Sequence, residues 1–177
     1  MRERVPRSRG ERLPALLFVL FLLLPRLSHS ASLDCSAVGD LKSGVPVKGD
    51  TTGGVSNVDS YPCTWRVESG PEAVYKITTT TTGDLVAKVA PAGAADLDVF
   101  ILGACDETAC AAYGDKEAIL AAAVPGTYYI VVEGYAGAEG QYTLAVTGLC
   151  EGVDCDDGDS CTQDTCDPGT GLCTHTP

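Results

Sequence analysis

The sequence predicts an all-β protein: an antiparallel β-sandwich followed by a small disulfide-rich C-terminal module. Three observations carry this prediction. Short runs rich in Val, Ile, Thr and Tyr recur between residues 74 and 147, with Gly and Pro turn signals between them. No long segment in that region shows the 3.6-residue period of an amphipathic helix. Nine cysteines, all beyond residue 34, indicate covalent cross-links.

The first 30 residues are typical of a secretory signal peptide. Five arginines lie within residues 1–12, a 12-residue apolar run follows at 13–24, and small residues stand at positions 28 and 30. We expect cleavage between Ser30 and Ala31, and cleavage after Ser32 satisfies the same rule. The apolar run is well short of the roughly 20 residues that span a bilayer. We therefore expect no membrane span after removal of this leader, and a secreted, extracellular or cell-surface location.

Beyond residue 30 the chain is strongly acidic. It carries 6 basic and 22 acidic residues there, a formal charge of −16. Nucleic acids and anionic membranes bind basic surfaces, so both are excluded as expected partners. A divalent cation remains compatible with this charge.

The N-terminal part of the sandwich has the weakest pattern. Residues 49–54 and 57–62 have loop chemistry, and we expect one or two short strands between residues 31 and 66. The next expected strand, 74–82, is a β-branched, Thr-rich run. Residues 85–90 then alternate Leu85, Ala87 and Val89 with Val86 and Lys88, as a half-buried strand does.

The second half of the sandwich has clearer signals. Residues 96–102 alternate Leu97, Val99 and Ile101 with Asp96, Asp98 and Phe100. The small-residue run at 118–124 has some helix propensity, but it is short and ends at a Pro-Gly turn, so we assign a strand. Residues 127–133 and 141–147 complete the set, the first rich in Tyr and Val and the second alternating.

The chain divides near Cys150 into an expected sandwich domain, 31–149, and a tail, 150–177. The tail is too short to bury a core, so disulfides must replace packing there. Four of its cysteines, Cys155, Cys161, Cys166 and Cys173, can form disulfides with one another in three ways, and their spacing does not choose between these. In the sandwich we expect Cys105–Cys110 within one loop and then Cys35–Cys63. Cys150 is then the odd cysteine, which either bridges back to the N-terminal segment or belongs to the tail.

The motifs of the sandwich resemble the bacterial pre-peptidase C-terminal domain family. The matching segments are Val74-Tyr75-Lys76-Ile77, Asp96-Leu97-Asp98-Val99-Phe100, residues 125–132, Gly134-Tyr135-Ala136-Gly137 and residues 140–146. The resemblance implies a jelly-roll-like β-sandwich that is non-catalytic and often appended to secreted peptidases.

The tail is similar to the Dictyostelium (slime-mould) cysteine repeat. Its four cysteines at 155, 161, 166 and 173, with interleaved Asp and Gly, carry the likeness. That family implies extracellular matrix or surface proteins, usually with tandem copies. One copy is present here.

Catalysis is not expected from these residues. A Ser or Cys nucleophile needs a positioned base, normally His, and residues 31–149 contain no histidine. Calcium is the cofactor hypothesis: Asp96 and Asp98 share one strand face, and Asp115 lies in a Gly-Asp turn that can approach them. The alternative is that these carboxylates accept backbone N–H bonds from neighbouring loops.

Aromatic side chains suggest a ligand surface. Trp65, Tyr113 and Tyr135 are candidates for stacking on sugar rings, while the alternative for Trp65 is packing over the neighbouring Cys63. The sequence therefore favours a secreted, non-catalytic binding or adhesion module, calcium-stabilised, that recognises extracellular polysaccharide or protein. The alternative is a structural or targeting domain associated with secreted peptidases.

Overall fold

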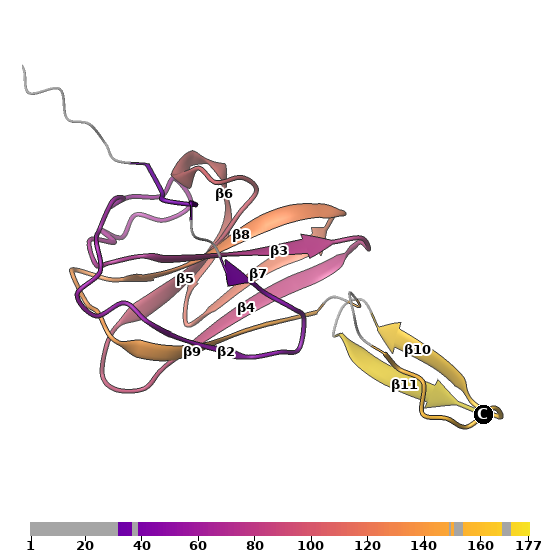
Figure 1. Ribbon diagram of the computed structural model, residues 1–177. Helices are drawn as coiled ribbons and strands as arrows, with labels where there is room; N and C mark the ends of the chain where they lie inside the picture. Colours follow the sequence, from indigo (N-terminus) through magenta and orange to yellow (C-terminus); the bar gives the residue numbers. More distant parts are fainter. Residues whose placement is uncertain (1–31, 37–38, 149, 151–153, 168–170) are drawn as a thin grey trace, which may run out of the picture.

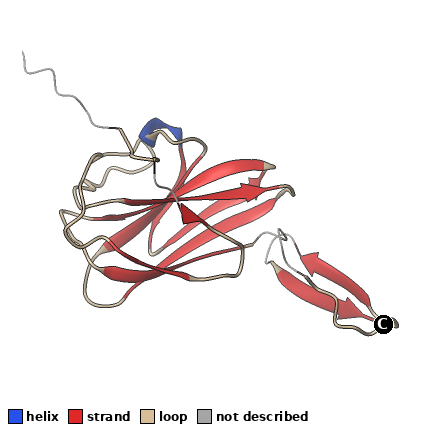
Figure 2. Cartoon of the chain, in the orientation of Figure 1, coloured by secondary structure: helices blue, strands red, loops and turns tan. Residues whose placement is uncertain are grey.

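The computed structural model describes residues 32–36, 39–148, 150, 154–167 and 171–177. The expected leader and its cleavage site at Ser30 and Ala31 lie outside these residues. Within them the regular structure is almost entirely strand, with one short 3₁₀ turn (Figure 2). No helix in the described part of the chain has the length and apolar character to cross a membrane.

The described strands are β1 (Gly39–Asp40), β2 (Val47–Asp50), β3 (Ala73–Thr79), β4 (Gly83–Pro91), β5 (Leu97–Leu102), β6 (Cys110–Asp115), β7 (Glu117–Ala123), β8 (Gly126–Gly134), β9 (Gln141–Thr147), β10 (Gln163–Asp167) and β11 (Leu172–Thr176), and the 3₁₀ turn is η1 (Glu107–Ala109).

Two sheets face each other in a jelly-roll arrangement (Figure 1). The five-stranded sheet has the order β1-β3-β8-β5-β6, and the four-stranded sheet has the order β2-β9-β4-β7. From β2 to β9, no more than two consecutive strands belong to the same sheet. All strand pairings within these two sheets are antiparallel except the parallel β1–β3 pair. The expected all-β sandwich of jelly-roll type with a disulfide-rich tail is confirmed.

The core between the sheets follows from period-two alternation. Leu97, Val99 and Ile101 of β5 point inward and meet Leu85 of β4 and Leu144 of β9, all fully buried. Because successive side chains of a strand point to opposite faces, Asp98 and Phe100 must point outward. An ordinary two-layer sandwich would leave that outward face in water.

A third layer covers the outer face of the five-stranded sheet. The connection between β2 and β3, residues 51–72, is called the covering segment below. Its Val58 and Tyr61 pack with Leu33 against Phe100 and Leu102 of β5. Tyr61 stacks on Phe100 with ring centroids 4.1 Å apart. All six residues of β5 are consequently buried.

Two disulfides fix this layer, and their pairing corrects the sequence prediction. Cys35 bonds Cys105, and Cys63 bonds Cys110, with Cα atoms 6.3 and 5.8 Å apart. The expected Cys105–Cys110 and Cys35–Cys63 pairs are wrong. Cys110 stands opposite Leu102 in the ladder and so shares its outward face, where the covering segment lies.

Strand β6 was not expected, because its Gly114-Asp115 pair has turn chemistry. The turn lies one residue later, at Lys116, which has a φ of 71°. Gly114 is required where it stands, because a Cβ there would overlap the carbonyl oxygen of Glu117. The expected strand at 118–124 is confirmed as β7 despite its helix propensity.

The tail forms its own two-stranded antiparallel sheet, β10–β11, drawn in yellow in Figure 1. Its disulfides are Cys150–Cys166 and Cys155–Cys173. Cys161 is the free, exposed cysteine. Cys150 is therefore not the odd cysteine, because it bonds Cys166 of the hairpin, as the alternative that it belongs to the tail predicts. Cys161 has no disulfide partner.

Candidate functional site

A row of carboxylates crosses the outer face of the five-stranded sheet. Asp98 of β5 stands directly opposite Glu133 of β8 on one side and Asp115 of β6 on the other. Directly opposite residues of antiparallel strands place their side chains on the same face, about 5 Å apart at Cβ. Asp98 and Glu133 are fully buried, so like charges are brought together away from water.

Asp96 adds a fourth carboxylate to one end of this row. It is the residue immediately before β5, and because it lies two residues before Asp98, the two side chains are on the same face of the chain. One carboxylate oxygen from each of Asp96, Asp98 and Asp115 lies within 4.8 Å of the other two. Oxygen ligands bind Ca²⁺ at about 2.4 Å, so ligands on opposite sides of one ion lie about 4.8 Å apart. The three predicted residues are thus brought together at a spacing compatible with one cation.

The covering segment places Arg66 and Glu68 over this group. Arg66 Nη2 is 3.2 Å from Asp96 Oδ2, and Arg66 Nε is 3.3 Å from Asp98 Oδ2 and 3.5 Å from Glu68 Oε1. On its other side the guanidinium lies 4.1 Å from the ring centroid of Tyr135. A bridge between Glu68 and Tyr135 holds the covering segment in this place.

Several buried atoms in this group lack a hydrogen-bond partner. Both carboxylate oxygens of Glu68, both of Asp98 and Oε1 of Glu133 are buried without one, and so is Arg66 Nε. An uncompensated buried charge costs several kcal/mol. The carboxylates therefore require protons or a further cation.

Titration behaviour reflects this burial. Burial raises the pKa of Glu133 to about 9, against the opposing effect of the hydrogen bond that the Tyr61 hydroxyl donates to it. Burial also raises the pKa of Glu68, with a further contribution from Asp98, and that of Asp98 itself. The hydrogen bond with Glu68 opposes the rise in the pKa of Asp98, and the charge of Arg66 opposes the rise in the pKa of both groups.

Sequence reasoning identified Asp96, Asp98 and Asp115 but missed Arg66, Glu68, Glu133 and Tyr61. Glu133 had one signal: it is an acid at the end of the apolar run 128–132. Arg66 and Glu68 had none, because their role depends on the path of a loop.

The three candidate aromatic contacts lie in different environments. Trp65 is 86% exposed, so the alternative that it packs over a disulfide is wrong. Tyr135 lies beneath the Arg66 guanidinium. Tyr113 of β6 is 36% exposed and stacks with Phe100 at 6.1 Å, which extends the Tyr61–Phe100 stack to the surface.

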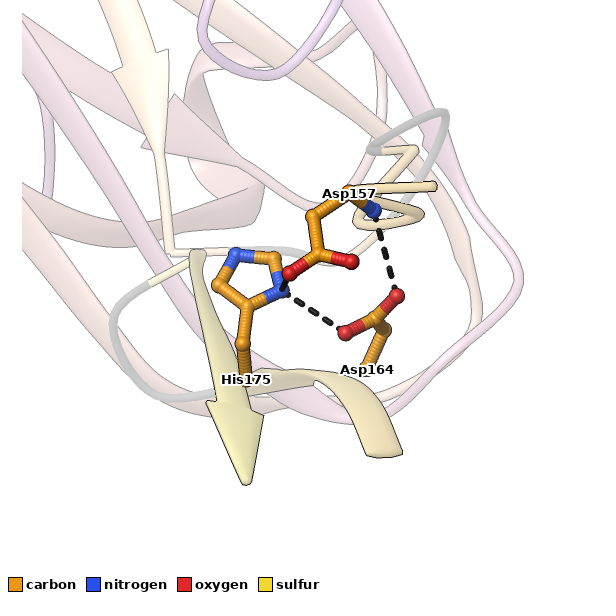
Figure 3. A group of neighbouring side chains, drawn as sticks. All are labelled: Asp157, Asp164 and His175. Atoms are coloured by element: carbon orange, nitrogen blue, oxygen red, sulfur yellow. Dashed lines mark hydrogen bonds and ion pairs between the residues drawn. The ribbon is translucent and has the colours of Figure 1, made fainter. Parts of the chain in front are cut away.

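A second polar cluster lies in the tail hairpin (Figure 3). His175 Nδ1 is 2.7 Å from Asp164 Oδ1 and 3.4 Å from Asp157 Oδ2. The hydrogen bond between His175 and Asp164 raises the pKa of the histidine and lowers that of the aspartate. Asp157 also accepts bonds from the Asp159 amide and the Thr162 hydroxyl. These contacts connect the loop before β10 to both strands of the hairpin.

Comparison with known proteins finds similarities for the tail and for the sandwich. Residues 154–177 match the family described as the Dictyostelium (slime mold) repeat, so the expectation for the tail is confirmed. The structure is similar to the pre-peptidase C-terminal domain of collagenase from Bacillus anthracis, with 20% identity and a TM-score of 0.47, over 63% of this chain and 95% of that one.

A second solved structure with a similar fold is PliG of Aeromonas hydrophila, a periplasmic inhibitor of g-type lysozyme. It is 11% identical, with a TM-score of 0.41, over 63% of this chain and 96% of that one. A search of curated protein sequences finds no match.

Proposed function

We propose that this chain is a secreted, non-catalytic module that is stabilised by calcium and binds extracellular polysaccharide. Four disulfides among nine cysteines support an oxidising compartment outside the cytosol. The buried carboxylates beneath Arg66 are the observation on which the calcium site rests. We also retain the proposed division into a sandwich domain at 31–149 and a repeat at 150–177.

Calcium suits this group because its ligands are hard oxygens at the correct spacing. Asp98 would supply the buried ligand, and Asp96 and Asp115 would supply ligands nearer the surface. A bound divalent ion would compensate charges for which the protein itself offers the Arg66 guanidinium and, at Asp115, the Lys116 ammonium.

The expected ligand surface lies beside this site. Trp65 directly precedes Arg66, and Val67 directly follows it with 58% exposure. An exposed indole with a low entropy cost of ordering is a good platform for a sugar ring. The acidic charge of the chain disfavours nucleic acid, whereas a neutral polysaccharide carries no such penalty.

The calcium site is tested by thermal and calorimetric titration of the EDTA-treated protein. At a calcium concentration a hundred times Kd, binding stabilises the folded state by about 2.7 kcal/mol. Asp115→Asn should abolish this response, while the matched control Asp40→Asn should retain it. Both aspartates are exposed and ion-paired to a lysine, Asp40 with Lys76 at 3.3 Å. No heat and no melting shift in the wild-type protein would exclude the site.

Polysaccharide binding is tested with glycan arrays and pull-down on insoluble polysaccharides, with Trp65→Ala as the test variant. The control is Ile119→Ala, another exposed apolar residue (54%) on the other sheet. Loss of binding in the first variant alone supports the proposal. Negative results for the wild-type protein on glycan and peptide arrays would instead favour a structural or targeting role.

A further inference from the structure

Arg66 occupies the position of a cation in the carboxylate group. Its guanidinium lies within 3.5 Å of oxygens from Glu68, Asp96 and Asp98. It is also the only arginine after residue 30. The sandwich thus supplies its own positive charge to the place where we propose a metal ion.

The fit between the guanidinium and these carboxylates is poor. Arg66 Nε faces two carboxylates with one hydrogen and makes no directed hydrogen bond to either. Arginine–carboxylate pairs that are built for stability are usually bidentate, with parallel N–H···O bonds. The buried Glu68 and Asp98 side chains face each other and share a hydrogen bond when Glu68 is protonated, but neither accepts one from Arg66. The guanidinium donates one hydrogen bond, from Nη2 to Asp96 Oδ2 at 3.2 Å, and none to Glu68 or Asp98.

The Arg66 side chain is partly open to solvent and is not anchored in a strand. It is 20% exposed, and the residue belongs to the covering segment. The guanidinium already lies 4.1 Å from the ring centroid of Tyr135, so this cation–π contact can hold it once its carboxylate contacts are lost. Its neighbours Trp65 and Val67 are among the most exposed apolar residues described.

We propose that Arg66 is a tethered counter-ion that a divalent cation displaces, so that cation binding rearranges the Trp65–Val67 surface. A small ion of charge +2 neutralises more of this group than a delocalised charge of +1, and it uses the carboxylate oxygens that Arg66 leaves unpartnered. Metal occupancy is thereby coupled to the surface that we assign to ligand binding. This inference rests on the proposed calcium site and specifies how that site is regulated.

The direct test uses the wild-type protein without its leader. An arginine-directed dicarbonyl reagent, phenylglyoxal, then has one target, Arg66, and mass spectrometry gives its rate of modification. We expect calcium to accelerate this reaction at least about fivefold, with free N-acetylarginine amide as the control for reagent chemistry. The fluorescence of Trp65, the chain's one tryptophan, should change over the same calcium range. An unchanged or slower modification rate, with calcium bound by calorimetry, would overturn the inference.

A variant gives the complementary test. Arg66→Gln should bind calcium at least about tenfold more tightly than the wild-type protein, because the competing cation is gone. Lys76→Gln, which removes a lysine paired to the exposed Asp40, should leave the affinity unchanged.

The outcomes separate the two proposals. No calcium binding by either wild-type or Arg66→Gln protein excludes the site itself. Wild-type binding with equal or weaker binding by Arg66→Gln retains the site and excludes displacement. Binding by Arg66→Gln alone overturns the inference, because calcium then does not displace the native arginine. If Arg66→Gln does not fold, the modification rate of the wild-type protein decides.

Discussion

Replacing Glu133 by Gln tests whether the carboxylate row is buried as described. Glu133 is fully buried, accepts a hydrogen bond from Tyr61, and has its pKa raised from 4.5 to about 9. Between these two values the folded chain keeps a proton that the unfolded chain has lost. Unfolding then releases a proton, so the free energy of unfolding falls as the pH rises. The stability is fully present below pH 4.5 and is lost progressively up to about pH 9.

The size of the effect follows from proton linkage. One retained proton changes the free energy of unfolding by about 1.4 kcal/mol per pH unit, or about 3 kcal/mol between pH 4.5 and 7. Glutamine has the shape of the neutral acid and does not titrate, so this contribution disappears in Glu133→Gln. Glu68 and Asp98 titrate in both proteins, and the difference between the two proteins isolates Glu133.

The assay is urea unfolding of oxidised protein at pH 5, 6, 7 and 8 in the presence of EDTA. The stability of wild-type protein should fall more steeply with pH than that of Glu133→Gln, with a difference of about 1 kcal/mol per pH unit. Glu117→Gln is the control, because Glu117 is exposed and paired with Lys88 at 3.2 Å. Parallel pH profiles of wild-type and Glu133→Gln protein would refute burial of a neutral carboxyl group.

Three further predictions follow from the cross-links and the tail. In unfolded, non-reduced protein a maleimide should label Cys161 alone, and peptide mapping that finds another labelled cysteine would contradict the pairing. Replacing Cys35 and Cys105 together by Ser should lower the free energy of unfolding by about 4 kcal/mol, because their bond closes a loop of sequence separation 70; a loss under about 1 kcal/mol in denaturant unfolding would contradict it. Asp164→Asn should lower the pKa of His175, because it replaces the carboxylate that stabilises the imidazolium; an unchanged NMR titration of the ring protons would exclude that role.

The sandwich was predictable because its strands carry their pattern locally. The alternation in 96–102 and 141–147 gave the inward faces of β5 and β9, and the Pro-Gly turn gave the start of β8. Strand β6 escaped prediction because Ala, Gly and Asp have low strand propensity there. Pairing with β5 overrides that propensity.

The third layer was not predictable, because it depends on contacts distant in sequence. Alternating apolar and acidic residues in β5 suggest one face in water, yet the covering segment buries Asp98. For the same reason the aspartate cluster was found and its arginine was not. The two disulfides of the sandwich were misassigned because they join the layers rather than close local loops.

The Cys35–Cys105 bond also determines how the sandwich would respond to tension. If the protein were held at its N-terminus and pulled from its tail, force would pass through this bond directly to the segment before β6. The intervening 70-residue span, which contains β1 to β5, would bear no load and could not extend. About 240 Å of contour length would thus be withheld from stretching. Reduction would release this length together with the shorter loops closed by the tail disulfides, so single-molecule extension with and without a reductant would differ by at least that length.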